Sequence, residues 1–555
     1  MQPCDETRMS GSGINDATRS GRPGPPGTAA GENVRGAPAS NPGREVADQS
    51  SQPLSDAPAP ARRAPAGLWL WLAGGSTTAI LILAAGRYGY HRDELYFLTA
   101  GRHLAWGYPD QPPLTPLLAH LMSSVAPESL TVLRLPAALI AGVVVMLTGL
   151  IARELGAERP AQLLAAACMA VAGGTLAITH SLGTSTLDLL FWTVLTFLVV
   201  RLLRGADPRW WPAVGAVLGM GLQNKWLLAF FAVALILGLV IGGPRRILRS
   251  PWLWAGALTA GLIWAPNLIW QAEHRWPQLQ LSSSIAAGGS TSSQPRYLFV
   301  PLELLIMSPV LVPIWGVGLC RLLGAKTALP RLKQFGAFGY AYLVLLVVFI
   351  ATGGKPYYLI GTYPMLFAAG AEPTVAWARQ GRSIVRKGLL TTALVLSLVI
   401  DSIISLPVLP VRLVPASPVL ALNPDVGETV GWPGFVETVT AVYRRAPPGS
   451  VILMGNYGEA GAVDRYGPSA GLPGAYSGHN GYGLWGQPPD TASGSAVVVG
   501  ITEAQLRLWF TAVEQMATID NRLGLDNDEQ DKPVWLCTGQ RRPWSEIWPS
   551  VKRLG

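Results

Sequence analysis

This chain has little charge and few cysteines, and both shortages exclude classes of protein. Only 14% of its 555 residues are charged, whereas 50% are hydrophobic, and the mean hydropathy is +0.32. A soluble enzyme usually carries about 25% charged residues. The composition therefore predicts a polytopic α-helical membrane protein.

The four cysteines predict neither a disulfide framework nor a zinc site. Cys168 and Cys320 fall within apolar runs, whereas Cys4 and Cys537 lie in opposite terminal parts of the chain. The spacing is not that of metal ligands. The net charge of +9 comes from short basic clusters between apolar runs, so we expect no nucleic-acid partner. Nucleotide-binding and catalytic-triad patterns are also missing.

The first 66 residues are rich in Gly, Pro, Ala and Ser and have no apolar periodicity. Such a segment cannot bury enough surface to offset its chain entropy, so residues 1–66 are predicted to form a disordered cytoplasmic tail. No short apolar core of a cleavable signal stands near its start, and the run at 67–86 is therefore expected to remain as an anchor.

Apolar runs then recur, and most have about the 20 residues that a helix needs to cross a membrane. They predict a transmembrane region over residues 67–407 with about eleven helices. The expected spans are 67–86, 130–152, 162–181, 186–204, 210–223, 226–243, 252–270, 298–322, 335–352, 358–376 and 388–407.

Basic residues mark the expected orientation. They gather in alternate loops, as in Arg245, Arg246 and Arg249, and this bias places those loops and the N-terminus in the cytoplasm. The first outer loop, residues 87–129, then lies outside the membrane. The chain is accordingly expected to be a multi-pass protein of the cell membrane.

After residue 407 the apolar runs stop, and residues 408–555 have a soluble pattern. Val451–Met454, Ala496–Val499 and Val534–Leu536 are expected strands, and Glu503–Ala517 is an expected amphipathic helix. They predict a small extracytoplasmic α/β domain. Two of its segments, at 457–466 and 476–485, either line an acceptor path or are simply loops.

The segment His91–Pro116 combines acids, bases and aromatic rings beside a membrane span. Its acidic pair, Asp93 and Glu94, has two interpretations: it stabilises a helix N-terminus, or it serves chemistry. A partly desolvated carboxylate among stacking rings can act as a general base toward a hydroxyl group. We favour that interpretation for Asp93.

A proline corner follows in the sequence GYPDQPPLT. Pro112 and Pro113 restrict the backbone and bias Gln111 toward an extended conformation, so the segment ends one helix and begins another. Rigidity alone leaves Asp110 unexplained. This second carboxylate is expected to orient the site or to bind a cation.

Three features together resemble the GT-C glycosyltransferases. They are the acidic pair in the first outer loop, the acid-x-Pro-Pro-Leu corner and the Lys-x-Tyr-Tyr-Leu segment at 355–359. The nearest subgroup is family 39, which includes protein O-mannosyltransferases and aminoarabinose transferases, and the resemblance covers about residues 67–376. It implies a GT-C fold.

The resemblance also implies an activity: transfer of a sugar, with inversion, from a polyprenyl-phosphate donor to an extracytoplasmic hydroxyl. It assigns Asp93 as the base, Glu94 as its orienting neighbour and Asp110 as the acid of the corner. Some relatives carry a phosphate-binding lysine where this chain has Gln111. Another cation must then face the donor phosphate.

Lys225 and Lys355 are the candidates for that cation. Lys225 is either a phosphate ligand or an interfacial lysine that extends to the headgroups. Lys355 follows two glycines and precedes Tyr357 and Tyr358, whose hydroxyls suit a phosphate, although an aromatic belt is the alternative.

Further candidates are Arg92 for the phosphate and Asp188 and His103 for shaping the site or holding the acceptor. Asp188 lies at the outer end of an apolar run, where an acid is costly unless it is used or caps the helix. The three acids Asp93, Glu94 and Asp110 suit Mg²⁺ or Mn²⁺ if a metal takes part.

The sequence thus predicts a membrane glycosyltransferase with mannose as the favoured sugar. A glycan, a lipid, a protein and a peptide natural product all fit as acceptors. The alternative is a transporter or a flippase of lipid-linked sugars. Transporters usually place their charges near the membrane midplane and show internal repeats, whereas here the charges gather toward one face.

Overall fold

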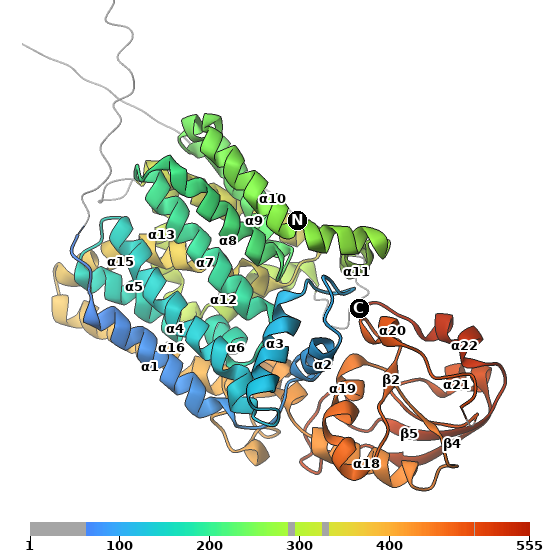
Figure 1. Cartoon of the computed structure of the whole chain (residues 1–555). Coiled ribbons are helices and arrows are strands. Elements are labelled where there is room, and N and C mark those ends of the chain that lie inside the picture. Colours follow the sequence, from blue (N-terminus) through green and yellow to red (C-terminus); the bar gives the residue numbers. More distant parts are fainter. Residues whose placement is uncertain (1–62, 287–294, 325–331, 493) are drawn as a thin grey trace, which may run out of the picture. The chain divides into compact units, whose positions relative to one another are not determined.

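The computed structural model describes residues 63–286, 295–324, 332–492 and 494–555 (Figure 1). Helices dominate up to residue 405, and one five-stranded sheet lies near the C-terminal end. The predicted disordered tail, except for its last four residues, falls outside the described residues.

Each of the eleven predicted apolar runs coincides with a helix or a bent pair of helices. The single helices are α1 (Leu68–Ala85), α4 (Leu130–Glu154), α7 (Thr184–Leu203), α8 (Trp211–Leu222), α9 (Leu227–Gly242), α10 (Pro251–Glu273), α14 (Gly336–Thr352), α15 (Tyr363–Arg379) and α16 (Ser383–Ser405). One bent pair joins α5 (Arg159–Val171) to α6 (Gly173–His180) at 56°. The other joins α12 (Phe299–Ile306) to α13 (Val312–Leu322) at 77°, each with a short 3-10 turn at its start.

The number of membrane crossings is smaller by length alone than the sequence predicted. Among the described residues, six helices are long and apolar enough to cross, or up to eight if each bent pair is one span. The remaining helices α8, α9 and α15 have 12, 16 and 17 residues. These fall short of the roughly 20 residues that a straight crossing needs, so the count of eleven stays a prediction.

The helices pack through small residues, as membrane helices do. A Cβ atom added to Gly74 of α1 would lie 2.6 Å from the Gly142 carbonyl oxygen of α4, and one added to Gly370 of α15 would lie 1.8 Å from the Ile314 oxygen of α13. The outer helices expose apolar side chains, and only 17% of the apolar window of α10 is buried. Such a surface suits lipid and agrees with a polytopic membrane protein.

The first outer loop contains two further helices, α2 (Arg92–Arg102) and α3 (Leu114–Val125). A capping box begins α2: the Asp93 N–H donates to His91 Nδ1, and the His91 N–H donates to Glu94 Oε2. Helix α3 starts directly after the proline corner. Its first N–H, from Leu114, donates to the Gln223 carbonyl 3.0 Å away, which ties the corner to the turn between α8 and α9.

The C-terminal part contains the sheet in the order β2-β1-β3-β5-β4. Its strands are β1 (Val451–Met454), β2 (Tyr476–Ser477), β3 (Ala496–Val499), β4 (Phe510–Thr518) and β5 (Pro533–Gln540). Strand β1 runs parallel to β2 and β3, with Ile452 opposite Val497, whereas β5 is antiparallel to both β3 and β4. The helices around it are α18 (Trp432–Tyr443), α19 (Tyr457–Tyr466), α20 (Tyr482–Trp485), α21 (Glu503–Trp509) and α22 (Trp544–Val551).

Two expectations for this domain need correction. The predicted helix Glu503–Ala517 ends at Trp509, and the residues after it form β4. They become a strand because β5 offers a partner along its length, from Phe510 opposite Gln540 to Thr518 opposite Pro533. The segment at 457–466, considered as a loop, is helix α19.

Helix α2 packs directly against α19 (Figure 1). One apolar cluster contains Leu95 and Phe97 of α2 together with Val463 of α19 and Ile452 of β1. The start of α2 therefore lies beside α19, which follows the carboxyl end of β1, and open parallel sheets usually hold ligands at that edge.

Candidate active site

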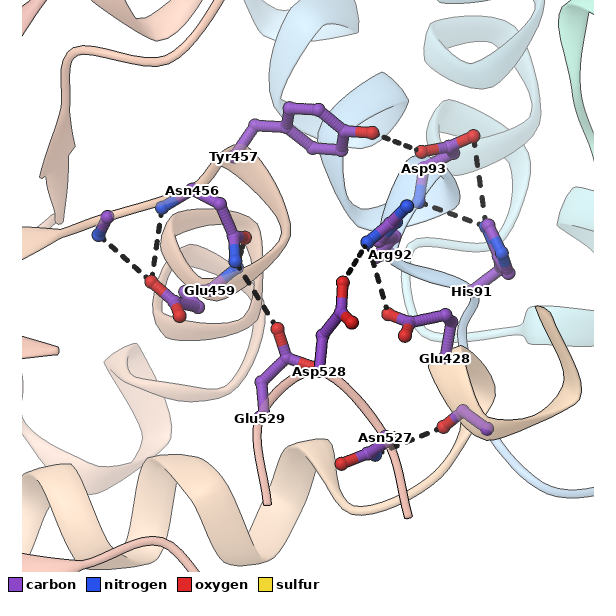
Figure 2. Close-up of polar contacts among 12 residues, drawn as sticks. His91, Arg92, Asp93, Glu428, Asn456, Tyr457, Glu459, Asn527, Asp528 and Glu529 are labelled. Atoms are coloured by element: carbon purple, nitrogen blue, oxygen red, sulfur yellow. Dashed lines mark hydrogen bonds and ion pairs between the residues drawn. The ribbon is translucent and has the colours of Figure 1, made fainter. Parts of the chain in front are cut away.

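Asp93 lies in the first turn of α2 and keeps 44% of its side chain accessible. Tyr457, the first residue of α19, donates its hydroxyl hydrogen to Asp93 Oδ1 at 2.8 Å (Figure 2). The second oxygen, Oδ2, lies 3.9 Å from His91 Nδ1, which is beyond hydrogen-bond distance. Tyr457 thus holds one oxygen of the carboxylate, and the side chain as a whole stays partly accessible.

The electrostatic surroundings keep Asp93 ionised. Burial raises the pKa of its carboxyl group, but His91 and Arg92 lower it. The hydrogen bond from Tyr457 and the charge of Lys355 lower it further, so the pKa of Asp93 lies below its ordinary value. An ionised carboxylate at neutral pH is able to accept a proton.

Glu94 has different surroundings from its neighbour. Its side chain is fully buried, and Arg134 of α4 binds it at two points, from Nε to Oε1 at 2.8 Å and from Nη2 to Oε2 at 2.7 Å. The backbone N–H groups of Leu182 and His91 donate to the same two oxygens. This geometry suits an anchor for the start of α2 better than a group that contacts substrate.

Arg134 was not among the predicted site residues. It is 1% exposed and also donates to the carbonyl oxygens of Ala85 and Gly89, so it joins α1, α2 and α4. The sequence contains a signal for it, because an arginine inside an apolar run needs an acidic partner. The sequence does not identify Glu94 as that partner.

A small pocket of mixed polar and apolar lining lies at the ends of α7 and α9 and at the 3-10 helix that carries Tyr357 and Tyr358. Asp188, Lys225, Tyr357 and Tyr358 line it together with Ser185. Lys225 Nζ donates to Ser185 Oγ at 3.0 Å and lies 5.4 and 5.2 Å from the ring centres of Tyr357 and Tyr358. The sequence-predicted residues Lys225, Tyr357, Tyr358 and Asp188 are thus brought together in one place.

The proline corner helps to build this pocket. Thr115, at the start of α3, donates its hydroxyl hydrogen to Asn224 Oδ1 at 2.7 Å, and Asn224 Nδ2 donates to the Thr184 carbonyl at 2.7 Å. Asn224 is fully buried and precedes Lys225 in the chain. The corner therefore holds the turn that carries the lysine.

Lys355 stands at the start of the 3-10 helix η6 (Pro356–Thr362), which also carries the two tyrosines. Gly353 before it has φ 70°, a left-handed conformation that glycine adopts without strain. The charge of Lys355 acts on both Asp93 and Lys225. The charges of the two lysines and of the Asp93 carboxylate therefore influence one another.

Asp110 lies beside the same site. Tyr96 of α2 donates its hydroxyl hydrogen to Asp110 Oδ1 at 2.7 Å, and the Gly481 N–H donates to the Tyr96 hydroxyl oxygen at 3.1 Å. Burial raises the pKa of Asp110 to about 7, and the hydrogen bond from Tyr96 limits the rise. Next to it, Gln111 is 3% exposed, which leaves it a packing position in the corner.

Arg92 and His103 lie away from the pocket. The Arg92 guanidinium lies 2.8 Å from Asp528 and 3.5 Å from Glu428, so acids of the C-terminal domain balance its charge (Figure 2). His103 ends α2 and stacks on Trp485 with ring centres 4.8 Å apart. These partners argue against the predicted phosphate role of Arg92 and give His103 a contact with the C-terminal domain.

The three acids proposed for a metal do not fit one. Across residues 63–286, 295–324, 332–492 and 494–555, no three His, Cys, Asp or Glu side chains are grouped to hold an ion. Both oxygens of Glu94 are already bound by Arg134. We therefore derive no step through a metal at Asp93, Glu94 and Asp110.

Comparison with known proteins gives an independent line of evidence. Residues 110–270 match the family described as dolichyl-phosphate-mannose-protein mannosyltransferase. No curated protein sequence matches the chain.

Two solved structures share the fold. ArnT from Cupriavidus metallidurans in the apo state is 13% identical with a TM-score of 0.56, over 85% of this chain and 98% of that one. The same protein bound to undecaprenyl phosphate has a TM-score of 0.53 and 13% identity, over 84% and 98% of the two chains. The family match over residues 110–270 and the shared fold both agree with the predicted resemblance to the GT-C glycosyltransferases.

Proposed function

We propose that the protein transfers a sugar from a polyprenyl-phosphate carrier to a hydroxyl group at the outer membrane face. One observation carries the proposal: the partly open carboxylate of Asp93 interacts electrostatically with Lys355 and with Lys225, and Lys225 lines the pocket with Tyr357 and Tyr358. A base beside a cationic pocket is what transfer from a phosphate leaving group needs. The ArnT structure of the same fold that holds undecaprenyl phosphate supports this type of donor.

The proposed reaction assigns a role to each of these groups. The donor phosphate enters the pocket, where the ammonium group of Lys225 and the hydroxyls of Tyr357 and Tyr358 stabilise its charge, and Lys355 at the start of η6 adds a second ammonium group. Asp93 Oδ2 takes the proton of the acceptor hydroxyl while that oxygen attacks the anomeric carbon. The bond from this carbon to the phosphate oxygen breaks, and polyprenyl phosphate leaves with the electron pair.

The proposed attack is in line with the leaving phosphate, so the anomeric configuration is inverted, as the family resemblance implies. The leaving phosphate is already charged and needs no strong general acid. Fixed cations that face charge developing in the transition state usually contribute a large part of the rate enhancement.

Mannose is the proposed sugar, because the matched family acts with dolichyl-phosphate-mannose. We further propose that the protein works in the cell membrane with the C-terminal domain outside, as the distribution of basic loops indicates. A glycan, a lipid, a protein and a peptide natural product remain the candidate acceptors. The shared fold and the pocket beside Asp93 favour a transferase over a transporter.

The test uses the full chain in nanodiscs with radiolabelled undecaprenyl-phosphate mannose and a membrane fraction of the producing cells as the acceptor source. Wild-type protein should consume the donor and label the acceptor fraction, and Asp93→Asn should reduce both rates by at least a hundredfold. Glu437→Gln serves as the matched control, since Glu437 is 65% exposed and pairs with the exposed Arg522. Labelling at the wild-type rate by Asp93→Asn would contradict the proposal.

A further inference from the structure

We propose that Tyr457 of the C-terminal domain is a positioning residue for the base: it holds Oδ1 of Asp93, so that Oδ2 accepts the proton of the acceptor. The inference rests on the proposed function and extends it. In this inference the C-terminal domain contributes a residue that positions the catalytic base.

The contact joins two distant parts of the chain. The Tyr457 hydroxyl lies 2.8 Å from Asp93 Oδ1, and the two residues are 364 positions apart in sequence. The backbone nitrogen of Asp93 lies 3.2 Å from His91 Nδ1. Oδ2 lies 3.9 Å from it. Tyr457 therefore distinguishes the two oxygens of the base.

The ring of Tyr457 packs against two other rings, those of Tyr96 and His479. Its centre lies 4.8 Å from that of Tyr96, with an angle of 38° between the planes. On another side it lies 4.7 Å from the ring of His479, which follows β2, at an angle of 37°. A ring packed between two others cannot rotate away without breaking both contacts. The direction of the hydroxyl group is thus fixed by packing.

The backbone at Tyr457 is equally constrained. It is the first residue of α19, whose N-cap Asn456 forms a capping box with Glu459. Glu459 is fully buried, accepts the N–H groups of Gly455 and Asn456, and binds Lys532 Nζ at 2.9 Å. A capped helix start placed directly after a buried strand gives the tyrosine a rigid support.

Two glycines let α19 approach α2 closely enough for the contact. A Cβ atom at Gly458 would lie 2.8 Å from Arg92 Cβ, and one at Gly461 would lie 2.9 Å from the Leu95 carbonyl carbon. Residues three apart share one face of a helix, so the glycines form a flat strip against α2. A larger residue at either position would move Tyr457 away from Asp93.

Further contacts hold the same interface together. Arg92, next to Asp93, pairs with Asp528 at 2.8 Å. The Tyr482 hydroxyl lies 3.0 Å from the Thr99 hydroxyl on the next turns of α2. The neighbours of Asp93 on α2 are thus bound by the C-terminal domain, and docking of that domain determines the geometry of the base.

Removal of the hydroxyl has a defined electrostatic effect. Tyr457 lowers the pKa of Asp93, and its loss should raise that pKa. The groups that face Asp93 from the packed elements are Arg92 and His91, Lys355 and Lys225, Tyr357, Asp110 and His479. None of them is changed by a substitution at Tyr457. The acidic limb of the rate profile should therefore move to higher pH when the hydroxyl is removed.

The test compares Tyr457→Phe with Tyr466→Phe in the nanodisc transfer assay over a range of pH. Tyr466 lies on the same helix and packs on Tyr90 with ring centres 6.4 Å apart, so it controls for loss of a tyrosine hydroxyl in α19. Tyr457→Phe should lower kcat roughly tenfold to a hundredfold, as expected for loss of a hydrogen bond to a charged group. KM for undecaprenyl-phosphate mannose should stay unchanged. The acidic limb of the pH–rate profile should move to higher pH.

Gly461→Leu adds an independent variant. It should lower kcat at least as strongly as Tyr457→Phe, because it pushes α19 off α2 while Tyr457 is still present. Gly474→Ala is its control, since a Cβ atom there meets only an ordinary contact, 3.7 Å from Asp464.

Two results would overturn the inference and leave the proposed function standing. The first is Tyr457→Phe with wild-type kcat and a wild-type pH profile while Asp93→Asn is inactive. The second is full activity in Gly461→Leu. Activity of Asp93→Asn itself would instead reject the proposed function.

Discussion

Glu94 and Arg134 form a buried two-point ion pair that joins the start of α2 to the membrane helix α4. The side chains are 0% and 1% exposed, and two nitrogen–oxygen contacts of 2.8 and 2.7 Å link them. The residue next to the proposed base is thus fixed to the membrane region, whereas the base itself is held by the C-terminal domain. Asp93 lies where these two attachments meet.

Removal of one partner of this pair should destabilise the protein strongly. Glu94→Leu or Arg134→Met leaves a buried charge without compensation, which typically costs about 3–5 kcal/mol. We expect a lower thermal midpoint in detergent for each variant. The double variant should lose less than the sum of the two, because it removes both charges together. Additive losses would contradict the coupling.

Lys225 and Lys355 should determine donor affinity. Substitution of either by Ala removes a positive charge that faces the proposed phosphate, so binding of undecaprenyl phosphate should weaken by roughly tenfold or more. Microscale thermophoresis with undecaprenyl phosphate itself measures this without a turnover assay. Lys387→Ala is the control, since Lys387 is exposed near the start of α16, away from the pocket. Equal affinities for all variants would contradict the pocket assignment.

Asp110 should make stability depend on pH in a predictable direction. Its pKa of about 7 lies above that of an unfolded Asp, so the folded state binds more protons than the unfolded state between about pH 4 and pH 7. Stability should therefore decrease as the pH rises through this window, with a slope of at most about 1.4 kcal/mol per pH unit. The check is to measure the thermal midpoints of the wild type and of Asp110→Asn from about pH 4.5 to about pH 8, in steps of roughly 0.5 pH units.

The Asp110→Asn variant should have the flatter profile, because its amide does not titrate. Its midpoint should exceed that of the wild type most clearly above about pH 7. Parallel profiles for the two proteins would place the titrating group elsewhere.

The apolar runs predicted the membrane-region helices, and the described structure has a helix or a bent pair at each of the expected runs. The apolar content of a segment is local, and membrane insertion depends on that content. The two bends at 56° and 77° were not predicted, because they depend on how the broken helices pack against their neighbours.

The C-terminal sheet shows where local patterns reach their limit. β1 and β3 lie where the apolar residues at 451–454 and 496–499 predicted them. Residues 510–517 were predicted as helix, but pairing with β5 makes them a strand. Strand formation depends on a partner, and the sequence of one segment does not show whether a partner is present.

Some properties of the site residues could likewise be predicted from the sequence, whereas others depend on their surroundings in the fold. Residue type and position in the chain are enough to single out Asp93, Lys225, Lys355 and the two tyrosines as candidates. The separate roles of the acidic pair could not be predicted, because Asp93 and Glu94 are adjacent and chemically alike. Only their surroundings differ: one is 44% accessible, and the other is enclosed by Arg134.

By itself, the sequence determined that this is a membrane protein with a small soluble domain and an acidic pair beside its first span. Those features follow from hydropathy and residue type, which act over short stretches of chain. Only the tertiary structure decided that Tyr457 meets Asp93 across 364 positions and that Glu94 pairs with Arg134 across 40. Such contacts arise when whole helices pack, and the strip of Gly458 and Gly461 allows that packing.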